Sequence, residues 1–210
     1  MKRPLIISDC DEVLLHMVAP FKIWLETSQG VDFSLEGHNF AEALRWQNSG
    51  ELLEPKDIWK MLGGFFDTEM DTQTPIDGAV EAINALGEHA DIVVLTNLVD
   101  ERREKRAEQL ASVGIHAPVY TNQGPKGPAL QAIREELGTD RRTFFIDDLA
   151  QHHQSVKDVA PDVIRLHMCG EPMIADEITC AHSEGFAHAR IDRWGDALPW
   201  LVERMEKEAA

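Results

Sequence analysis

The sequence has no hydrophobic run long enough to cross a membrane. The apolar run that follows the basic start, within residues 1–10, is also too short for the core of a signal peptide. Cysteine is scarce, and the three cysteines are widely spaced and form no CxxC pattern. They predict no disulfide framework and fit free thiols in a reducing compartment. We therefore expect a soluble, cytoplasmic protein.

Basic residues are few. Lysine and arginine number 20 against 37 aspartates and glutamates, which gives a formal net charge of −17. Such a surface repels the phosphates of nucleic acids and anionic lipids, so we expect neither nucleic acid nor a membrane as a partner. A small anionic substrate stays compatible with the composition, because one local cation can outweigh the net field. The composition does not indicate an oligomeric state.

The 210 residues, of which 43% are hydrophobic, suffice for one domain with a small insert. Short apolar runs alternate with helical patterns, which predicts an α/β fold: a Rossmann-like, three-layer α/β/α core with a central parallel sheet. The expected strands cover residues 4–9, 91–97, 118–122, 143–148, 162–168 and 186–192. The expected helices of this core cover residues 76–89, 100–114, 127–138 and 193–208.

Residues 16–75 break this alternation. They contain no convincing strand and predict three helices, at residues 19–29, 39–47 and 55–67. Aromatic and aliphatic side chains recur there at helical spacing, which indicates the core of a small insert more than a stacking surface for a ligand. We therefore expect a core of residues 1–15 and 76–210 and a helical cap insert of residues 16–75.

Polar residues follow the expected strands at the points where they end. They are Asp9 and Asp11, Thr96 and Asn97, Lys126, and Asp147 and Asp148. The carboxyl ends of parallel strands lie along one edge of a sheet, where ligands bind, so these distant residues are expected to converge.

The chemistry of this set is complementary. Carboxylates with a carbonyl and water form a hard oxygen cage suited to Mg²⁺. Lys126 can neutralise an anion, and the Thr96 hydroxyl can bind its oxygens. An aspartate such as Asp9 can attack phosphorus and form an aspartyl-phosphate. A second carboxylate, Asp11, can protonate the leaving alcohol and then activate water.

Four segments resemble motifs of the haloacid dehalogenase superfamily of phosphohydrolases. They are "DCDEV" at the first strand end, "IVVLTN" at the second, Lys126, and "FFIDD". The segment "TPIDGAVEAINAL" resembles the approach to the second motif. The likeness covers roughly residues 1–15 and 76–160, and the position of the insert resembles the helical cap of the first type.

The resemblance implies a role for each matching residue. Asp9 is the nucleophile and a Mg²⁺ ligand, and Asp11 is the general acid/base whose carbonyl also binds the metal. Thr96, Asn97 and Lys126 bind phosphate, although Asn97 equally fits an ordinary turn residue. Asp147 and Asp148 complete the metal shell, and the sequence leaves open which of them is the direct ligand.

Two positions depart from the family pattern. Glu12 stands where many members have glycine, and we expect it to alter the turn after the first strand or to add charge near the mouth of the site. His153 stands roughly where many members have asparagine. Residues 152–154 otherwise fit surface or helix-terminal positions, and Cys10 fits a packed residue whose acidic neighbours keep its thiol protonated.

The sequence therefore predicts a Mg²⁺-dependent phosphomonoester hydrolase that acts on a small phosphorylated metabolite. A phosphomutase of the same superfamily is the alternative, as is a catalytically idle phosphate-binding module. Asp11 argues against dehalogenase and phosphonate-cleaving relatives, which lack that acid. A receiver domain would place its paired acids first in the chain, whereas here the pair comes last. The substrate itself is not encoded in any pattern that we can interpret.

Overall fold

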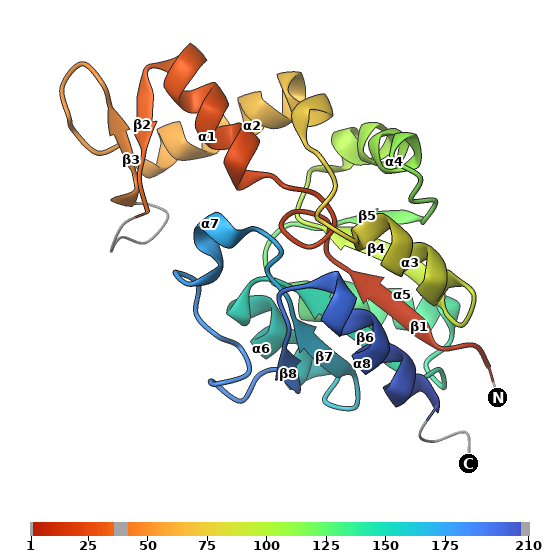
Figure 1. Ribbon diagram of the computed structural model, residues 1–210. Coiled ribbons are helices and arrows are strands. Elements are labelled where there is room, and N and C mark those ends of the chain that lie inside the picture. The colour runs from red at the N-terminus through yellow and green to blue at the C-terminus, as the bar shows by residue number, and fades with distance from the viewer. Residues whose placement is uncertain (1, 36–41, 207–210) are drawn as a thin grey trace.

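The computed structural model describes residues 2–35 and 42–206. Its centre is a parallel sheet with the strand order β5-β4-β1-β6-β7-β8 (Figure 1). The strands are β1 (Leu5–Ser8), β4 (Asp91–Thr96), β5 (Val119–Thr121), β6 (Thr143–Asp147), β7 (Ile164–His167) and β8 (Ala189–Arg190). β1 lies between β4 and β6, and Ser8 is in register with Val94 and Ile146. The chain thus turns from one half of the sheet to the other beside β1, where open α/β sheets bind ligands.

Helices cover both faces of this sheet, as predicted (Figure 1). They are α3 (Ala79–Gly87), α4 (Arg103–Ser112) and α8 (Trp194–Glu206) on one face, and α5 (Lys126–Leu137) and α6 (Ala150–Val159) on the other. Along β1, Ile6 joins the first apolar cluster, whereas Leu5 and Ile7 join the second. Every residue of β1 and β6 is buried, as expected of strands that are packed on both faces.

The segment between β1 and α3 has its own apolar cluster. Its elements are α1 (Val18–Trp24), which continues as a π-helical turn (Leu25–Gln29), then β2 (Val31–Phe33), β3 (Leu44–Trp46) and α2 (Pro55–Thr68). Phe21 and Phe65 pack edge to face in the cluster, with ring centroids 5.3 Å apart. The aromatic residues thus form a core there, in agreement with the sequence interpretation.

The expectation that this segment contains no strand is wrong. β2 and β3 form an antiparallel pair, with Val31 opposite Trp46 and Phe33 opposite Leu44. Of the helix expected over residues 39–47, residues 39–41 lie outside the described part, and Leu44–Trp46 form β3 instead. Because each strand is three residues long, the alternation that marks a strand has too few positions to stand out from a helical pattern.

The remaining differences lie after β6. The helix α6 was not predicted, and the last expected strand is reduced to the two residues of β8. A short helix, α7 (Pro172–Ala175), follows β7, and its Ile174 packs into the apolar cluster of the inserted segment. Short 3-10 helices occupy Met70–Thr72 and Asp100–Arg102. Within the described residues, none of the helices has the length and apolar character needed to span a membrane.

Candidate active site

The carboxyl end of the sheet brings Asp9 and Lys126 together. Asp9 is the first residue beyond β1, and its amide donates a hydrogen bond to the carbonyl of Ile146 in β6. Lys126 is the first residue of α5, and its side chain is fully buried. Its Nζ lies 2.7 Å from Oδ1 of Asp9 and 2.7 Å from Oδ2 of Asp147. This lysine is therefore part of the acidic site and not a solvated surface residue.

Asp9, Asp147 and Asp148 form a compact cluster of buried acids. One carboxylate oxygen of each lies within 4.8 Å of the others. Oδ2 of Asp147 is paired with Lys126, and its Oδ1 accepts a hydrogen bond from the amide of Leu149 (2.9 Å). Both oxygens of Asp147 thus have donors from the protein. The predicted convergence of the first and fourth motifs agrees with this geometry.

The charges in this cluster are not balanced. Burial raises the pKa of Asp9 to about 7, because the opposing charge of Lys126 does not offset desolvation and the repulsion from Asp147. Burial also raises the pKa of Asp148 well above its ordinary value, and the charges of Asp147 and Asp9 add to the rise. Burial alone would raise the pKa of Asp147 as well, but Lys126 together with His152 and His153 holds that pKa below the ordinary value.

A divalent cation fits these residues. Three carboxylates against one ammonium leave two negative charges uncompensated when all three acids are ionised. Carboxylate oxygens are the donors that hard cations such as Mg²⁺ and Ca²⁺ prefer. The raised pKa values of Asp9 and Asp148 have the same cause, since each carboxylate is desolvated beside like charge. The donor set and its charge therefore indicate a site for a divalent metal.

Thr96 ends β4 beside this cluster, and its side chain is 1% exposed. Among the described residues, its Oγ1 has no hydrogen-bond partner. A buried hydroxyl without a partner is costly, so this group is available to a ligand. Its predicted role in phosphate binding stays a prediction.

Asn97 is placed differently from its predicted role. Its side chain is exposed, its Nδ2 donates to the carbonyl of Gly124 (3.0 Å), and its Oδ1 accepts from Asn122 (2.9 Å). These bonds hold the loop that leads into α5 and hence to Lys126. The turn-forming interpretation of Asn97 therefore describes its side chain better than direct phosphate binding does.

The side chain of Asp11 lies in a second polar group beside the three acids. Its Oδ1 and Oδ2 accept from Nη2 of Arg106, at 3.0 and 3.2 Å, and its Oδ1 also accepts from Nε2 of Gln73 at 2.7 Å. Arg106 is fully buried, and its Nη1 contacts Sγ of Cys10 (3.3 Å). In this arrangement the Asp11 carboxylate is engaged by Arg106 and Gln73, and its predicted role as acid/base stays a prediction.

Arg106 and Gln73 are functional candidates that the sequence interpretation missed. Arg106 lies in a helix whose sequence is strongly polar, which hides one buried arginine. Its position four residues before the buried Leu110 was the one available signal, since residues at that spacing share a helix face.

Glu12 adopts a left-handed backbone with φ 60°, where glycine is the usual residue. Its side chain is 2% exposed, and its Oε1 accepts from the amides of Met17 (3.0 Å) and Val18 (2.5 Å). Burial raises the pKa of Glu12 to about 8. Glu12 thus keeps a backbone conformation that suits glycine, and an altered turn stays a prediction. The glutamate ties the end of β1 to the start of α1.

Two buried histidines contact the backbone carbonyls of the acidic pair Asp147 and Asp148. Nε2 of His153 lies 2.9 Å from the carbonyl oxygen of Asp147, and Nε2 of His167 lies 2.7 Å from that of Asp148. Nδ1 of His167 accepts from an amide, so its Nε2 carries the proton. The expectation of surface positions over residues 152–154 is wrong for His152 and His153, which are buried because α6 packs against α5 and the sheet.

Cys10 is fully buried between the two motif aspartates. Burial raises the pKa of its thiol strongly, and the charges of Asp11 and Asp9 add to the rise despite Arg106. It is a packed residue, as predicted, and not a thiolate nucleophile.

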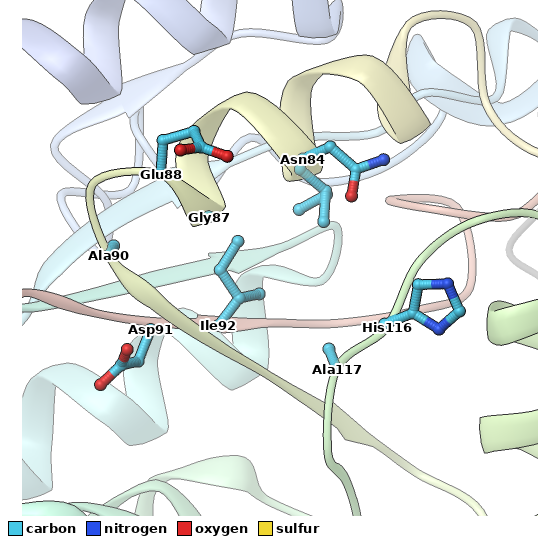
Figure 2. A pocket seen from close by; sticks show the side chains of 9 residues that line it. Asn84, Gly87, Glu88, Ala90, Asp91, Ile92, His116 and Ala117 are labelled. Atoms are coloured by element: carbon cyan, nitrogen blue, oxygen red, sulfur yellow. The ribbon is translucent and has the colours of Figure 1, made fainter.

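A hollow of about 380 Å³ lies at the opposite end of β4 (Figure 2). Asn84, Glu88, Asp91 and His116 surround it. Asp91 begins β4 and Thr96 ends it, so the strand length of roughly 17 Å separates this hollow from the acidic cluster. It is a surface feature apart from the candidate active site.

No protein-family model matches the sequence, and no curated protein matches it significantly. Solved structures do match the fold. A HAD family hydrolase from Deinococcus radiodurans R1, with bound phosphate and sodium, has a TM-score of 0.66 at 18% identity, with 96% of each chain covered.

Two further structures match over similar lengths. A predicted phosphoglycolate phosphatase from Haemophilus somnus 129PT has a TM-score of 0.68 at 13% identity, covering 96% of this chain and 99% of its own. The putative HAD-hydrolase YfnB from Bacillus subtilis, bound to magnesium, has a TM-score of 0.64 at 14% identity and the same coverage. The chain therefore has the fold of the haloacid dehalogenase-like superfamily.

Proposed function

We propose that the protein is a Mg²⁺-dependent phosphomonoester hydrolase that acts on a small phosphorylated metabolite through an aspartyl-phosphate. One observation carries the proposal. The Lys126 ammonium joins Asp9 to Asp147 at one edge of the sheet, beside Asp148 and the hydroxyl of Thr96, which has no partner in the described part of the chain. The named activities of the structural neighbours, hydrolase and phosphatase, support the same class of reaction.

The first step forms the aspartyl-phosphate. Lys126 and the amide of Cys10 both contact Oδ1 of Asp9, so Oδ2 is the oxygen that we assign to attack. The new bond joins Oδ2 to phosphorus while the bond from phosphorus to the ester oxygen breaks. Asp11 leaves Arg106 and takes up a proton from solvent, which it then gives to the departing alkoxide.

The second step returns the enzyme to its starting state. Asp11, now a carboxylate, takes a proton from a water molecule, and the oxygen of that water attacks phosphorus. The bond from phosphorus to Asp9 breaks, which releases inorganic phosphate and the free Asp9 carboxylate. Asp11 then loses the proton to solvent and pairs with Arg106 again. Lys126 and the Thr96 hydroxyl are the groups to which we assign binding of the phosphoryl oxygens in both steps.

Asp9 and Asp148, with the carbonyl of Asp11, are the residues that we assign to the metal. Both oxygens of Asp147 already have donors, which favours Asp148 as the direct ligand of the pair. When bound, Mg²⁺ would supply positive charge that favours ionised carboxylates and offsets the charge on the phosphoryl group.

Residues 16–75 are the proposed cap, and residues 1–15 and 76–210 the proposed catalytic core. An apolar cluster formed mostly by the inserted segment, with Leu98, Cys169 and Ile174 of the proposed core packed into it, supports this division. A cap of this kind would exclude water and select the alcohol part of the ester. The substrate is accordingly described by class, as a small phosphate monoester.

A phosphate-release assay with a panel of metabolite monoesters and Mg²⁺ tests the proposal. We expect turnover of at least one ester, loss of this activity in EDTA, and its return when Mg²⁺ is added. The Asp9→Asn variant should keep the fold and show no turnover. Adding sugar phosphates as acceptors separates hydrolysis from mutase chemistry. No release from any ester, or full activity without metal, would contradict the proposal.

A further inference from the structure

A second group of potential metal ligands lies apart from the three aspartates. One ligand atom each of Glu12, His16 and Glu171 lies within 4.8 Å of the other two. Glu12 and His16 belong to the stretch between β1 and α1, and Glu171 immediately precedes α7. The function proposed above uses none of these three side chains.

The backbone fixes this arrangement. The amide of Glu12 donates to the carbonyl of Leu15 (2.8 Å), which closes a tight turn just before His16. The amide of Gly170 donates to the carbonyl of Glu12 (2.6 Å) and so sets Glu171 beside that turn. A Cβ at Gly170 would lie 2.4 Å from Cγ2 of Ile76, so only glycine permits this approach. The three ligands are therefore held together before any ion binds.

Glu12 gives an independent indication of a ligand. Its side chain is 98% buried, since 2% of it is exposed, and its Oε1 is occupied by the amides of Met17 and Val18. Among the described residues, its Oε2 has no hydrogen-bond partner. The nearby charges of Asp11 and Glu171 are also negative. A buried carboxylate oxygen that lies near like charge and has no partner among the described residues is suited to bind a cation.

The donor atoms select the type of cation. A histidine nitrogen with two carboxylates suits Zn²⁺, whereas Mg²⁺ prefers oxygen donors alone. Nδ1 of His16 and Oε2 of Glu171 are 2.8 Å apart. Zn²⁺ bonds of about 2.0–2.2 Å separate ligand atoms by roughly 3.3–3.5 Å, so the pair opens by only about half an ångström on binding.

Two further features fit an ion site. Oε1 of Glu171 accepts from the amide of Met173 (2.9 Å), which orients the carboxylate as outer hydrogen bonds do around metals. The His16 side chain is 24% exposed, so solvent and ions can reach the group from that side. We propose that Glu12, His16 and Glu171 form a Zn²⁺ site that ties the start of α1 to the loop before α7.

The test uses the full chain, stripped with EDTA and then dialysed against Zn²⁺ in excess Mg²⁺, which fills the acidic site. Metal analysis and calorimetric titration with Zn²⁺ are expected to give one tightly bound Zn²⁺ per chain. His16→Gln and Glu171→Gln should each weaken binding at least about tenfold. Circular dichroism checks that each variant is folded. If His16→Gln does not fold, Zn²⁺ binding by Glu171→Gln tests the proposal.

Matched controls locate the ion. His116→Gln and Glu177→Gln alter exposed residues of the same types and should leave Zn²⁺ binding unchanged. Asp148→Asn should also retain it, since Asp148 belongs to the other cluster. Failure of the wild type to bind Zn²⁺ would overturn the proposal. So would full binding by both His16→Gln and Glu171→Gln, or loss of binding in Asp148→Asn alone. None of these readouts depends on phosphatase activity.

Discussion

Nζ of Lys126 lies 2.7 Å from Oδ1 of Asp9, and both side chains are buried. This contact joins the first residue of α5 to the first residue after the central strand. The same ammonium also pairs with Asp147. One cation thus lies between two buried carboxylates whose like charges would otherwise repel each other. The lysine thus has a structural role in this arrangement, and the proposed function adds a second role, the binding of a phosphoryl group.

Removing this ammonium should destabilise the protein and impair turnover. In Lys126→Met, Asp9 and Asp147 lose their shared partner, and we expect the free energy of unfolding without metal to fall by about 3–5 kcal/mol. Turnover with Mg²⁺ should fall at least about 100-fold. Urea unfolding and phosphate release measure the two effects. Lys56→Met, at an exposed position, is the control; equal stability and turnover in both variants would contradict this role.

Thr96→Val should separate activity from stability. The variant removes a buried hydroxyl without a described partner, so stability should stay equal or rise by up to about 1 kcal/mol. Turnover should fall by about 10- to 100-fold, because a donor to the phosphoryl oxygens is lost. In the control Thr143→Val, a hydroxyl that donates to the carbonyl of Arg141 is lost. That control should lose about 1 kcal/mol and keep its turnover; the reverse pattern would refute the assignment.

Asp11→Asn should lose about 10²- to 10⁴-fold in turnover. The loss should be larger for alkyl than for aryl phosphates, since an aryl oxide departs without protonation. With an aryl phosphate, the variant should release a burst of about one phenol per chain and then slow, because water attack on the aspartyl-phosphate lacks its base. Stopped-flow absorbance measures the burst. Asp71→Asn, at an exposed position, is the control, and an unchanged rate in Asp11→Asn would reassign the acid/base.

We expect the buried His153 to cause part of the loss of stability at low pH. Burial lowers its pKa from 6.5 to about 4, so the folded state binds fewer protons than the unfolded chain in that range. The stability that comes from the neutral imidazole is therefore present above pH 6.5 and is lost as the pH falls towards 4.

His153→Asn removes this titration and, with it, the contact of Nε2 with the carbonyl of Asp147. Its urea midpoint should fall less steeply than that of the wild type between pH 6.5 and 4. His116→Asn, at an exposed position, should follow the wild type. Parallel curves for wild type and His153→Asn would show that this imidazole does not contribute.

The strands of the sheet and the residues at their ends were predictable because buried parallel strands appear as apolar runs, such as "LIIS" before Asp9. Parallel topology then places the strand ends on one edge, which sufficed to bring Asp9, Lys126 and Asp147 together. The helix α6 was missed because its core-facing residues include His152 and His153, which the usual hydrophobic pattern does not count.

Contacts that depend on tertiary packing could not be predicted from the sequence. Nothing local indicates that Arg106 reaches Asp11, or that Gly170 brings Glu171 beside Glu12. The side-chain direction of Asn97 was equally hidden, because an exposed turn residue and a phosphate ligand have the same sequence signature. Such relations require the packed positions of helices and loops, which residue patterns do not encode.

Direct detection of the covalent intermediate tests the account most closely. Asp11→Asn, incubated with an aryl phosphate and Mg²⁺ and then reduced with borohydride, should contain homoserine in place of Asp9 in its N-terminal peptide by mass spectrometry. An unmodified Asp9 in a variant that has released its burst of phenol would contradict the central claim that Asp9 is the nucleophile.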